Sequence, residues 1–213
     1  NIYVFLMILT TVLLGGIGFL DDYIKVFRKN KKGLAGKFKV VGQVSVGLLV
    51  GAVLFFHPDV VTKVKPTGTE KVTYDELGEP ETTSTAQWVE EKSVKTNIPF
   101  VKNNEFDYAW LLGFLSAEKA AKGAWIVFIP IVVFVVTAVS NGANITDGLD
   151  GLATGSSAII GVVLAIFAFV SGNMIFANYL NIMFIPHSGE LTVFISAFVG
   201  ACIGFLWYNS FPA

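Results

Sequence analysis

Five long apolar segments dominate the chain, and polar connections separate them. Each is a continuous run without Asp, Glu, Lys or Arg, which is typical of helices that cross a bilayer. Only helices and closed barrels satisfy their backbone hydrogen bonds in lipid, and continuous rather than alternating runs favour helices. We therefore expect an all-α integral membrane protein, a polytopic bundle whose spans cover approximately Ile2–Leu20, Val40–Phe56, Trp125–Val139, Ser156–Val170 and Leu191–Tyr208.

The longest polar segment, residues 57–124, is predicted to be an extracytoplasmic insertion with some structure of its own. Val60–Tyr74 alternates β-branched and polar residues around Pro66-Thr67-Gly68, which predicts a β-hairpin. Glu76–Glu91 is polar and poor in aliphatic residues, as expected of a loop. Phe106–Leu115 is mostly apolar but too short to span, so we expect it to lie against the membrane surface.

Composition supports a membrane protein, and the distribution of charge predicts its orientation in the membrane. The chain is 54% hydrophobic and 15% charged, whereas a soluble domain carries about 25% charged residues. Seven of its 15 Lys and Arg residues fall within residues 21–39. Short connections rich in Lys and Arg stay in the cytoplasm, so we expect this connection there.

Counting spans from that connection gives the organisation of the whole chain. The next polar connection with many Asn and Asp residues returns to the same face of the membrane. The expected parts are residues 1–56 with two spans and the cytoplasmic connection 21–39, the insertion 57–124, and residues 125–213 with three spans and the cytoplasmic connection 141–155.

Asp21 and Asp22 form the first candidate site, directly after the first apolar run. Adjacent carboxylates at the end of a membrane helix are costly unless they are paired, solvated or bound to a cation. Asp21 and Lys25 are four residues apart and can form an ion pair on a helix. The alternative is a solvated connection whose lysines contact anionic lipid, which explains the lysines but not the aspartate pair.

The second candidate site is Asn141–Ala153, which holds two Asn and two Asp residues and no basic residue. Asp147 and Asp150 are three residues apart, so on a helical turn their carboxylates would point the same way. Asn and Asp are also common in caps and turns, so an ordinary loop is the alternative. Hard oxygen ligands without thiols or imidazoles suit Mg²⁺ bound together with substrate phosphates.

Three other residues carry weaker signals. Asn209 follows the last span and could contact a nucleobase or a sugar, but an isolated Asn at this place is more often a helix end ahead of a proline, here Pro212. His187 is expected in a turn, and Cys202 as a small buried apolar side chain. Together, carboxylates and lysines on one membrane face predict a site that holds Mg²⁺ on a pyrophosphate, with a lipid as one substrate.

These motifs resemble those of the polyprenyl-phosphate N-acetylhexosamine-1-phosphate transferases. Asp21-Asp22-Tyr23-Ile24-Lys25-Val26 resembles the aspartate-rich first loop of that family. The motif Asn141-x-x-Asn144-x-Thr146-Asp147-Gly148-Leu149-Asp150-Gly151 is similar to its most characteristic sequence, and Gly204–Ala213 resembles the span that leads into its nucleotide site. The Asp-Asp-Tyr-x-Lys form and Thr146 point to the branch whose donor is UDP-N-acetylmuramoyl-pentapeptide.

The resemblance implies a reaction in peptidoglycan synthesis. The phospho-sugar of the donor passes to undecaprenyl phosphate, giving lipid I and UMP, with Mg²⁺ as cofactor and the site on the cytoplasmic face of the bacterial inner membrane. It also implies residue roles. Asp21 and Asp22 would be catalytic, Asp147 and Asp150 would bind the metal, and substrate would contact Lys25, Lys29, Lys37, Asn141, Asn144, Gly148, Leu149, Asp150 and Asn209.

The chain also departs from the family pattern. Members have more spans, a later Gly-Asp pair that binds metal and a His-rich loop, so we expect this chain to be a fragment that is inactive alone. A sister enzyme that transfers N-acetylglucosamine-1-phosphate stays an alternative, as do an ion-coupled transporter using Asp147 and Asp150 and a scaffold without activity. We expect no nucleic-acid partner, and the oligomeric state stays open, with a homo-oligomer among the possibilities.

Overall fold

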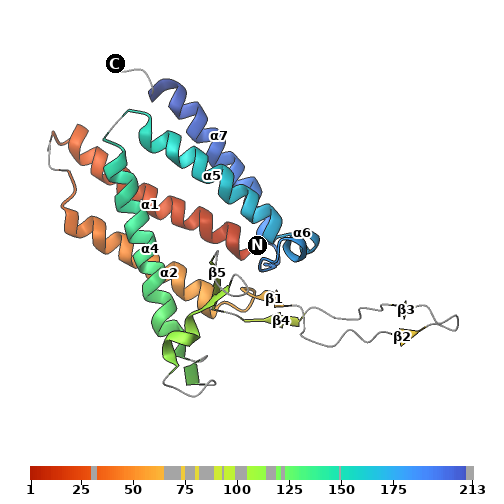
Figure 1. The fold of residues 1–213 in the computed structure, drawn as a ribbon. Coiled ribbons are helices and arrows are strands. Elements are labelled where there is room, and N and C mark those ends of the chain that lie inside the picture. Colours follow the sequence, from red (N-terminus) through yellow and green to blue (C-terminus); the bar gives the residue numbers. More distant parts are fainter. Residues whose placement is uncertain are drawn as a thin grey trace.

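The computed structural model contains five long helices that run between two ends of the molecule (Figure 1). It describes residues 1–29, 33–64, 73–74, 80–81, 89–92, 94–98, 105–113, 119–120, 123–148 and 150–209. All five helices are long and apolar enough to span a membrane, which confirms the polytopic helical fold. They are α1 (Ile2–Val26), α2 (Gly36–Phe56), α4 (Trp125–Thr146), α5 (Leu152–Ser171) and α7 (Leu191–Asn209).

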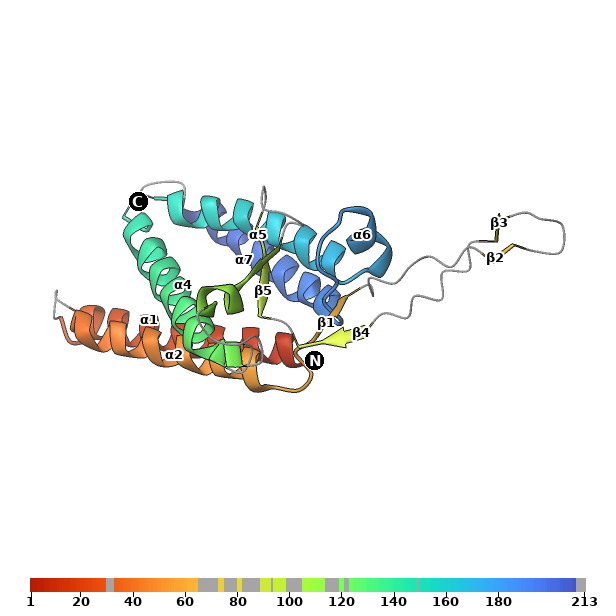
Figure 2. The ribbon, with the colours of Figure 1, turned by 60° about the horizontal axis from the view of Figure 1, so that its bottom comes forward.

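The helices are arranged as two closely packed pairs, with α1 beside them. α2 packs along α4 and α5 packs along α7, whereas α1 contacts α2 and, more lightly, α7. Glycines permit the close approach, because a Cβ on Gly47 would lie 2.8 Å from Cα of Val133, and one on Gly161 would lie 2.7 Å from Cγ2 of Val199. Small residues at such contacts are a common means of joining membrane helices. Figure 2 shows α5 and α7 on one side, α1 and α2 on the other, and α4 crossing obliquely.

Most large apolar side chains of the helices face outward. Phe134 of α4 is 72% exposed and Val193 of α7 is 76% exposed. The buried apolar residues of the described chain are mainly small or medium in size and include Cys202, as expected for this residue. Such an apolar surface would be a liability in water but is what a bilayer requires.

Successive helices run in opposite directions, so their polar ends collect at one end of the bundle (Figure 1). The last turns of α1, α4 and α7 and the first turns of α2 and α5 all lie toward that end. The strands lie toward the opposite end. This arrangement gathers both candidate motifs at one end, as span counting predicts, while the side of the membrane stays a prediction.

Among the residues that the structure describes, the insertion forms three short antiparallel strand pairs, and the described ends of the predicted hairpin pair with other segments. Thr62 lies opposite Glu91, and Thr73 lies opposite Glu81, so the described residues 60–64 and 73–74 do not pair with one another. Alternation identifies strands but not partners, and here more distant segments supply them. Pro66-Thr67-Gly68 lies outside the described residues. The pairs are β1 (Thr62–Val64) with β4 (Val89–Glu91), β2 (Thr73–Tyr74) with β3 (Pro80–Glu81), and β5 (Lys95–Asn97) with β6 (Glu105–Asp107).

Two of these strands, β3 and β4, fall within Glu76–Glu91, which the sequence predicts to be a loop. After β6 the chain forms a 3-10 helix, η2 (Tyr108–Leu112), which contacts α4. Five residues cannot cross a bilayer, which agrees with the expectation that this stretch does not span. Its contact with the membrane surface stays a prediction. Two more short helices, α6 (Met174–Tyr179) and η3 (Ser188–Glu190), connect α5 to α7, and His187 lies in a turn before η3.

Candidate functional site

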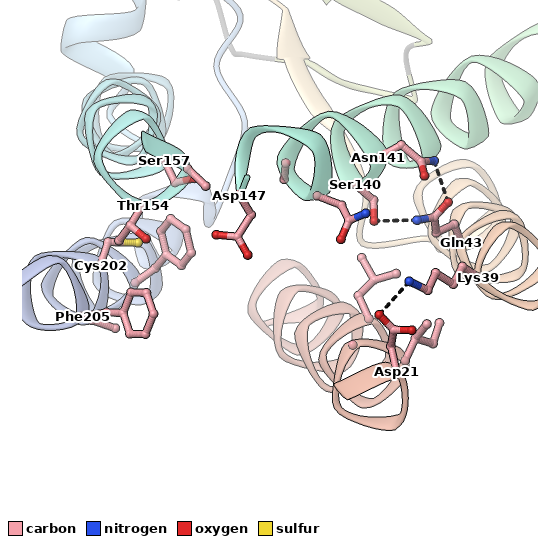
Figure 3. Close-up of a pocket in the computed structure, with 18 residues that line it drawn as sticks. Asp21, Lys39, Gln43, Ser140, Asn141, Asp147, Thr154, Ser157, Cys202 and Phe205 are labelled. Carbon is pink, nitrogen blue, oxygen red and sulfur yellow. Dashed lines mark hydrogen bonds and ion pairs between the residues drawn. The ribbon is translucent and has the colours of Figure 1, made fainter. Parts of the chain in front are cut away.

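A cavity of about 520 Å³ lies at the polar end of the bundle, and all five long helices contribute to its lining (Figure 3). Phe198, Cys202 and Phe205 of α7 form much of its apolar side. The polar side comes mainly from α1, α2 and α4, with two residues from α5. These polar lining residues are Asp21, Lys39, Gln43, Ser140, Asn141, Asn144, Asp147, Thr154 and Ser157.

The helices extend further into both motifs than the sequence predicts. α1 continues beyond the apolar run through Asp21 to Val26, and α4 continues through Asn141 to Thr146. Polar side chains do not by themselves end a helix, and here ion pairs engage Asp21 and hydrogen bonds engage Asn141. The motifs therefore lie on helix ends, which fix the direction of their side chains, and only short connections remain between the helices.

Asp21 is a buried residue, 5% exposed, and both oxygens of its carboxylate have polar partners. Its Oδ2 lies 2.6 Å from Nζ of Lys25 and 2.7 Å from Nζ of Lys39, and its Oδ1 accepts the amide N–H of Leu34 at 2.7 Å. The predicted pairing of Asp21 with Lys25 is thus confirmed. Asp21 joins α1 to α2 and holds Lys39 at the cavity.

The rest of the first motif lies outside the cavity. The Asp22 side chain is 75% exposed and approaches Lys25 at 3.5 Å. Lys29 and Lys37 are exposed and do not line the cavity. The connection between α1 and α2 folds back through Gly33, whose φ is +62°, and a Cβ there would collide with Oδ1 of Asp21.

A hydrogen-bonded amide pair links α2 to α4 on the cavity wall. Nδ2 of Asn141 donates to Oε1 of Gln43 at 2.8 Å and to the carbonyl of Thr137 at 2.8 Å. Nε2 of Gln43 donates to Oγ of Ser140 at 2.9 Å. Gln43 is 6% exposed. The sequence prediction missed it, although an amide inside an otherwise apolar run was an available signal.

Some residues of the second motif line the cavity and others lie outside it. Asn144 and Asp147 line the cavity, and the carboxylate of Asp147 has no hydrogen-bond or ion-pair partner among the described residues. Asp147 caps α4 at its C-terminus, so Asp147 and Asp150 lie in a turn rather than on one helical face. Gly148 and Asp150 are exposed and do not line the cavity.

Two other predicted contacts are not seen at the cavity. Asn209 is the last residue of α7 and does not line it. Leu149 lies outside the described residues. Besides Gln43, sequence reasoning did not select Lys39, Ser140, Thr154 and Ser157. Lys39 belongs to the basic connection 21–39, which was the available signal, whereas hydroxyl groups in apolar helices are too common to single out without the fold.

The oxygen donors at the cavity determine which metal could bind. Within the described part of the chain, no group of three or more Asp, Glu, His or Cys side chains gathers around one point. Asp147 and Asn144 offer one carboxylate and one amide oxygen. Mg²⁺ is bound by one or two carboxylates and takes its other ligands from water and substrate phosphates, so this donor set fits Mg²⁺ that binds with a phosphorylated substrate.

Comparison with known proteins gives consistent matches along the chain. Residues 4–213 match the family model described as glycosyl transferase family 4. All 213 residues align, at 61% identity, with 51% of the phospho-N-acetylmuramoyl-pentapeptide-transferase of Flavobacterium johnsoniae. The proteins with that name from Parabacteroides distasonis and Porphyromonas gingivalis are 59% and 56% identical, with 100% of this chain and 49% of each protein covered. The chain thus spans about half the length of these curated relatives.

Proposed function

The chain belongs to glycosyl transferase family 4, and from this premise we propose that it carries part of the active site of a phospho-sugar transferase. In the proposed reaction, phospho-N-acetylmuramoyl-pentapeptide passes from UDP to undecaprenyl phosphate. The products are lipid I, the first lipid-linked precursor of peptidoglycan, and UMP. The names of the relatives support this choice of donor and acceptor.

One observation carries the proposal: a single cavity receives residues from both polar motifs. Asp21 comes from the first motif and Lys39 from the end of the same basic connection, residues 21–39, while Asn144 and Asp147 come from the second motif. The cavity lies at the end of helices that are long and apolar enough to span a membrane. A lipid acceptor held in the bilayer and a water-soluble sugar nucleotide can both reach such a position.

The charges suit a transfer between phosphates. The ammonium of Lys39, directed at the cavity by Asp21, would neutralise phosphate oxygens of the donor or acceptor. Asp21 would act mainly by holding Lys25 and Lys39. The carboxylate of Asp22 is exposed and less tightly paired, so of the two aspartates it would be the more available to substrate. Lys29 and Lys37 would attract the anionic substrates from outside the cavity.

Mg²⁺ is the proposed cofactor, and Asp147 is the residue that would hold it, together with substrate oxygens. Bound there, the ion would offset the charge of the pyrophosphate and stabilise the departing UMP. Asn144 would supply an amide oxygen or orient the nucleotide. Asp150 lies beside the cavity rather than in it and would contribute only through water or substrate.

The proposed location is the bacterial inner membrane with the site facing the cytoplasm. The seven basic residues within 21–39 support this orientation, since such connections are retained in the cytoplasm. The carboxylates lie at helix ends rather than in the middle of the spans, which does not favour an ion pathway of a transporter.

The proposal is tested by measuring UMP release by the full-length protein in detergent with undecaprenyl phosphate and UDP-N-acetylmuramoyl-pentapeptide. We expect release to need both substrates and Mg²⁺, and to fall strongly in Asp147→Asn at a Mg²⁺ concentration that is limiting for the wild type. Asp59→Asn, at the opposite end of the bundle, is the matched control and should retain activity. Release with UDP-N-acetylglucosamine instead would favour the sister enzyme, and no UMP from either donor would contradict the proposal.

A further inference from the structure

Asn141 lines the cavity, and its amide has two chemically different ends. The nitrogen end donates hydrogen bonds and the oxygen end accepts them. Which end faces the cavity therefore decides whether a ligand must accept or donate at this position. The neighbouring groups determine the answer, because one of them can act in only one way.

The carbonyl oxygen of Thr137 can only accept, so the atom of Asn141 that lies 2.8 Å from it must be Nδ2. The same nitrogen donates to Gln43 at 2.8 Å, which requires Gln43 to present Oε1. Nε2 of Gln43 is thereby directed to Ser140, whose hydroxyl accepts at 2.9 Å. The two bonds drawn for Gln43 in Figure 3 are these contacts with Asn141 and Ser140.

Both N–H groups of Asn141 are used in this arrangement, one by Thr137 and one by Gln43. The Oδ1 atom is then the part of the side chain left for a ligand. Gln43 itself is buried, and an amide in a membrane helix is costly to bury without partners, so its two bonds hold it in one orientation. A rigid acceptor at Asn141 follows from this network.

We propose that Gln43 is a positioning residue that locks the Asn141 amide with its oxygen toward the cavity, so that this position binds an O–H or N–H group of the sugar nucleotide and not a phosphate oxygen. The inference rests on the proposed function and refines it. Phosphate oxygens accept hydrogen bonds and are repelled by a fixed carbonyl, whereas ribose or sugar hydroxyls and the uracil N–H can donate.

The test compares Gln43→Met with Gln43→Glu in the full-length protein. Methionine has a similar length but makes neither hydrogen bond, so Asn141 keeps only its bond to the Thr137 carbonyl and its amide is held less firmly. Glutamate accepts from Asn141 and can bond with the Ser140 hydroxyl, so it retains the orientation. We expect Gln43→Met to raise the KM for the sugar nucleotide about tenfold, equivalent to about 1.4 kcal/mol. The KM for the lipid acceptor should stay unchanged, and Gln43→Glu should restore most of the loss.

A double-mutant cycle separates positioning from a general structural role. If Gln43 acts through Asn141, Gln43→Met should have little further effect on KM in an Asn141→Ala background. Equal effects in both backgrounds would overturn the inference, as would an unchanged donor KM or a change only in the Mg²⁺ requirement. A wild-type protein that releases no UMP contradicts the proposed function and this inference with it, whereas an active wild type with an unaffected Gln43→Met variant contradicts the inference alone.

Discussion

The ammonium of Lys39 lies 2.7 Å from Oδ2 of Asp21, and this ion pair joins the end of α1 to the beginning of α2 at the cavity. The same oxygen is 2.6 Å from Lys25, and the other oxygen accepts from the Leu34 amide. One buried carboxylate thus organises two helices and the connection between them. Changes at this carboxylate should affect stability and activity together.

Asp21→Asn should lower both the activity and the stability of the full-length protein. The amide removes the charge that holds two ammonium groups, and hydrogen bonds to charged groups contribute about 1.5–3 kcal/mol each. We expect UMP release to fall on the order of a hundredfold, the scale seen when a positioned charge or donor is removed from an active site. Thermal unfolding in detergent measures the stability change. Asp22→Asn is the stability control, because its exposed side chain should leave the unfolding temperature near that of the wild type.

Gly33→Ala should also disturb the Asp21 carboxylate, in this case through a steric clash with its Oδ1 atom. The residue has a φ of +62°, and its new Cβ would meet Oδ1 of Asp21 and lie 2.8 Å from Cε of Lys25. We expect a loss of roughly 1–3 kcal/mol in stability from the strained backbone alone. Gly36→Ala is the matched substitution, since nothing lies within 4 Å of a Cβ there. Equal unfolding temperatures for the two variants would argue against this packing.

The two aspartates of the second motif should differ in their dependence on Mg²⁺. Asp147 lines the cavity and Asp150 does not. Asp147→Asn should raise the Mg²⁺ concentration needed for half-maximal UMP release at least about tenfold, a difference of about 1.4 kcal/mol. Asp150→Asn should raise it less. A larger shift for Asp150→Asn in the same titration would place the metal outside this cavity.

The orientation of the bundle can be measured by labelling single cysteines in a Cys202→Ala background. Cysteines at Lys29 and Asp150, both exposed at the polar end, should react with a membrane-impermeant maleimide only from the cytoplasmic side. A cysteine at Asp59, at the other end of α2, should react only from outside. Labelling of positions 29 and 150 from opposite sides would contradict both the fold and the site.

The sequence predicts the spans and the meeting of the two motifs because both follow from simple physical rules. An uncharged run of sufficient length has few alternatives to a membrane helix, and alternating spans bring every second connection to one end. Asp21 with Asp147 at one cavity is the result.

The remaining features depend on partners that are distant in the sequence. Thr62 pairs with Glu91 instead of folding back locally, and Ser140 and Asn141 of α4 find their hydrogen-bond partner on α2. The amide of Gln43 stands out in the sequence, but its role as a partner of Asn141 is visible only once α2 and α4 are packed together. Local patterns thus identify elements, while the partner of each polar side chain is known only once the helices are packed.

The close glycine contact at Gly47 has a mechanical consequence for the cavity. α2 and α4 form one closely packed pair that carries Lys39, Asn144 and Asp147, while α5 and α7 form a second pair that carries Phe198 and Phe205. The contacts between these two helix pairs are few, and the cavity lies between them. A ligand that contacts both helix pairs therefore restrains their separation. The distance between the two pairs should vary less when the cavity is occupied than when it is empty.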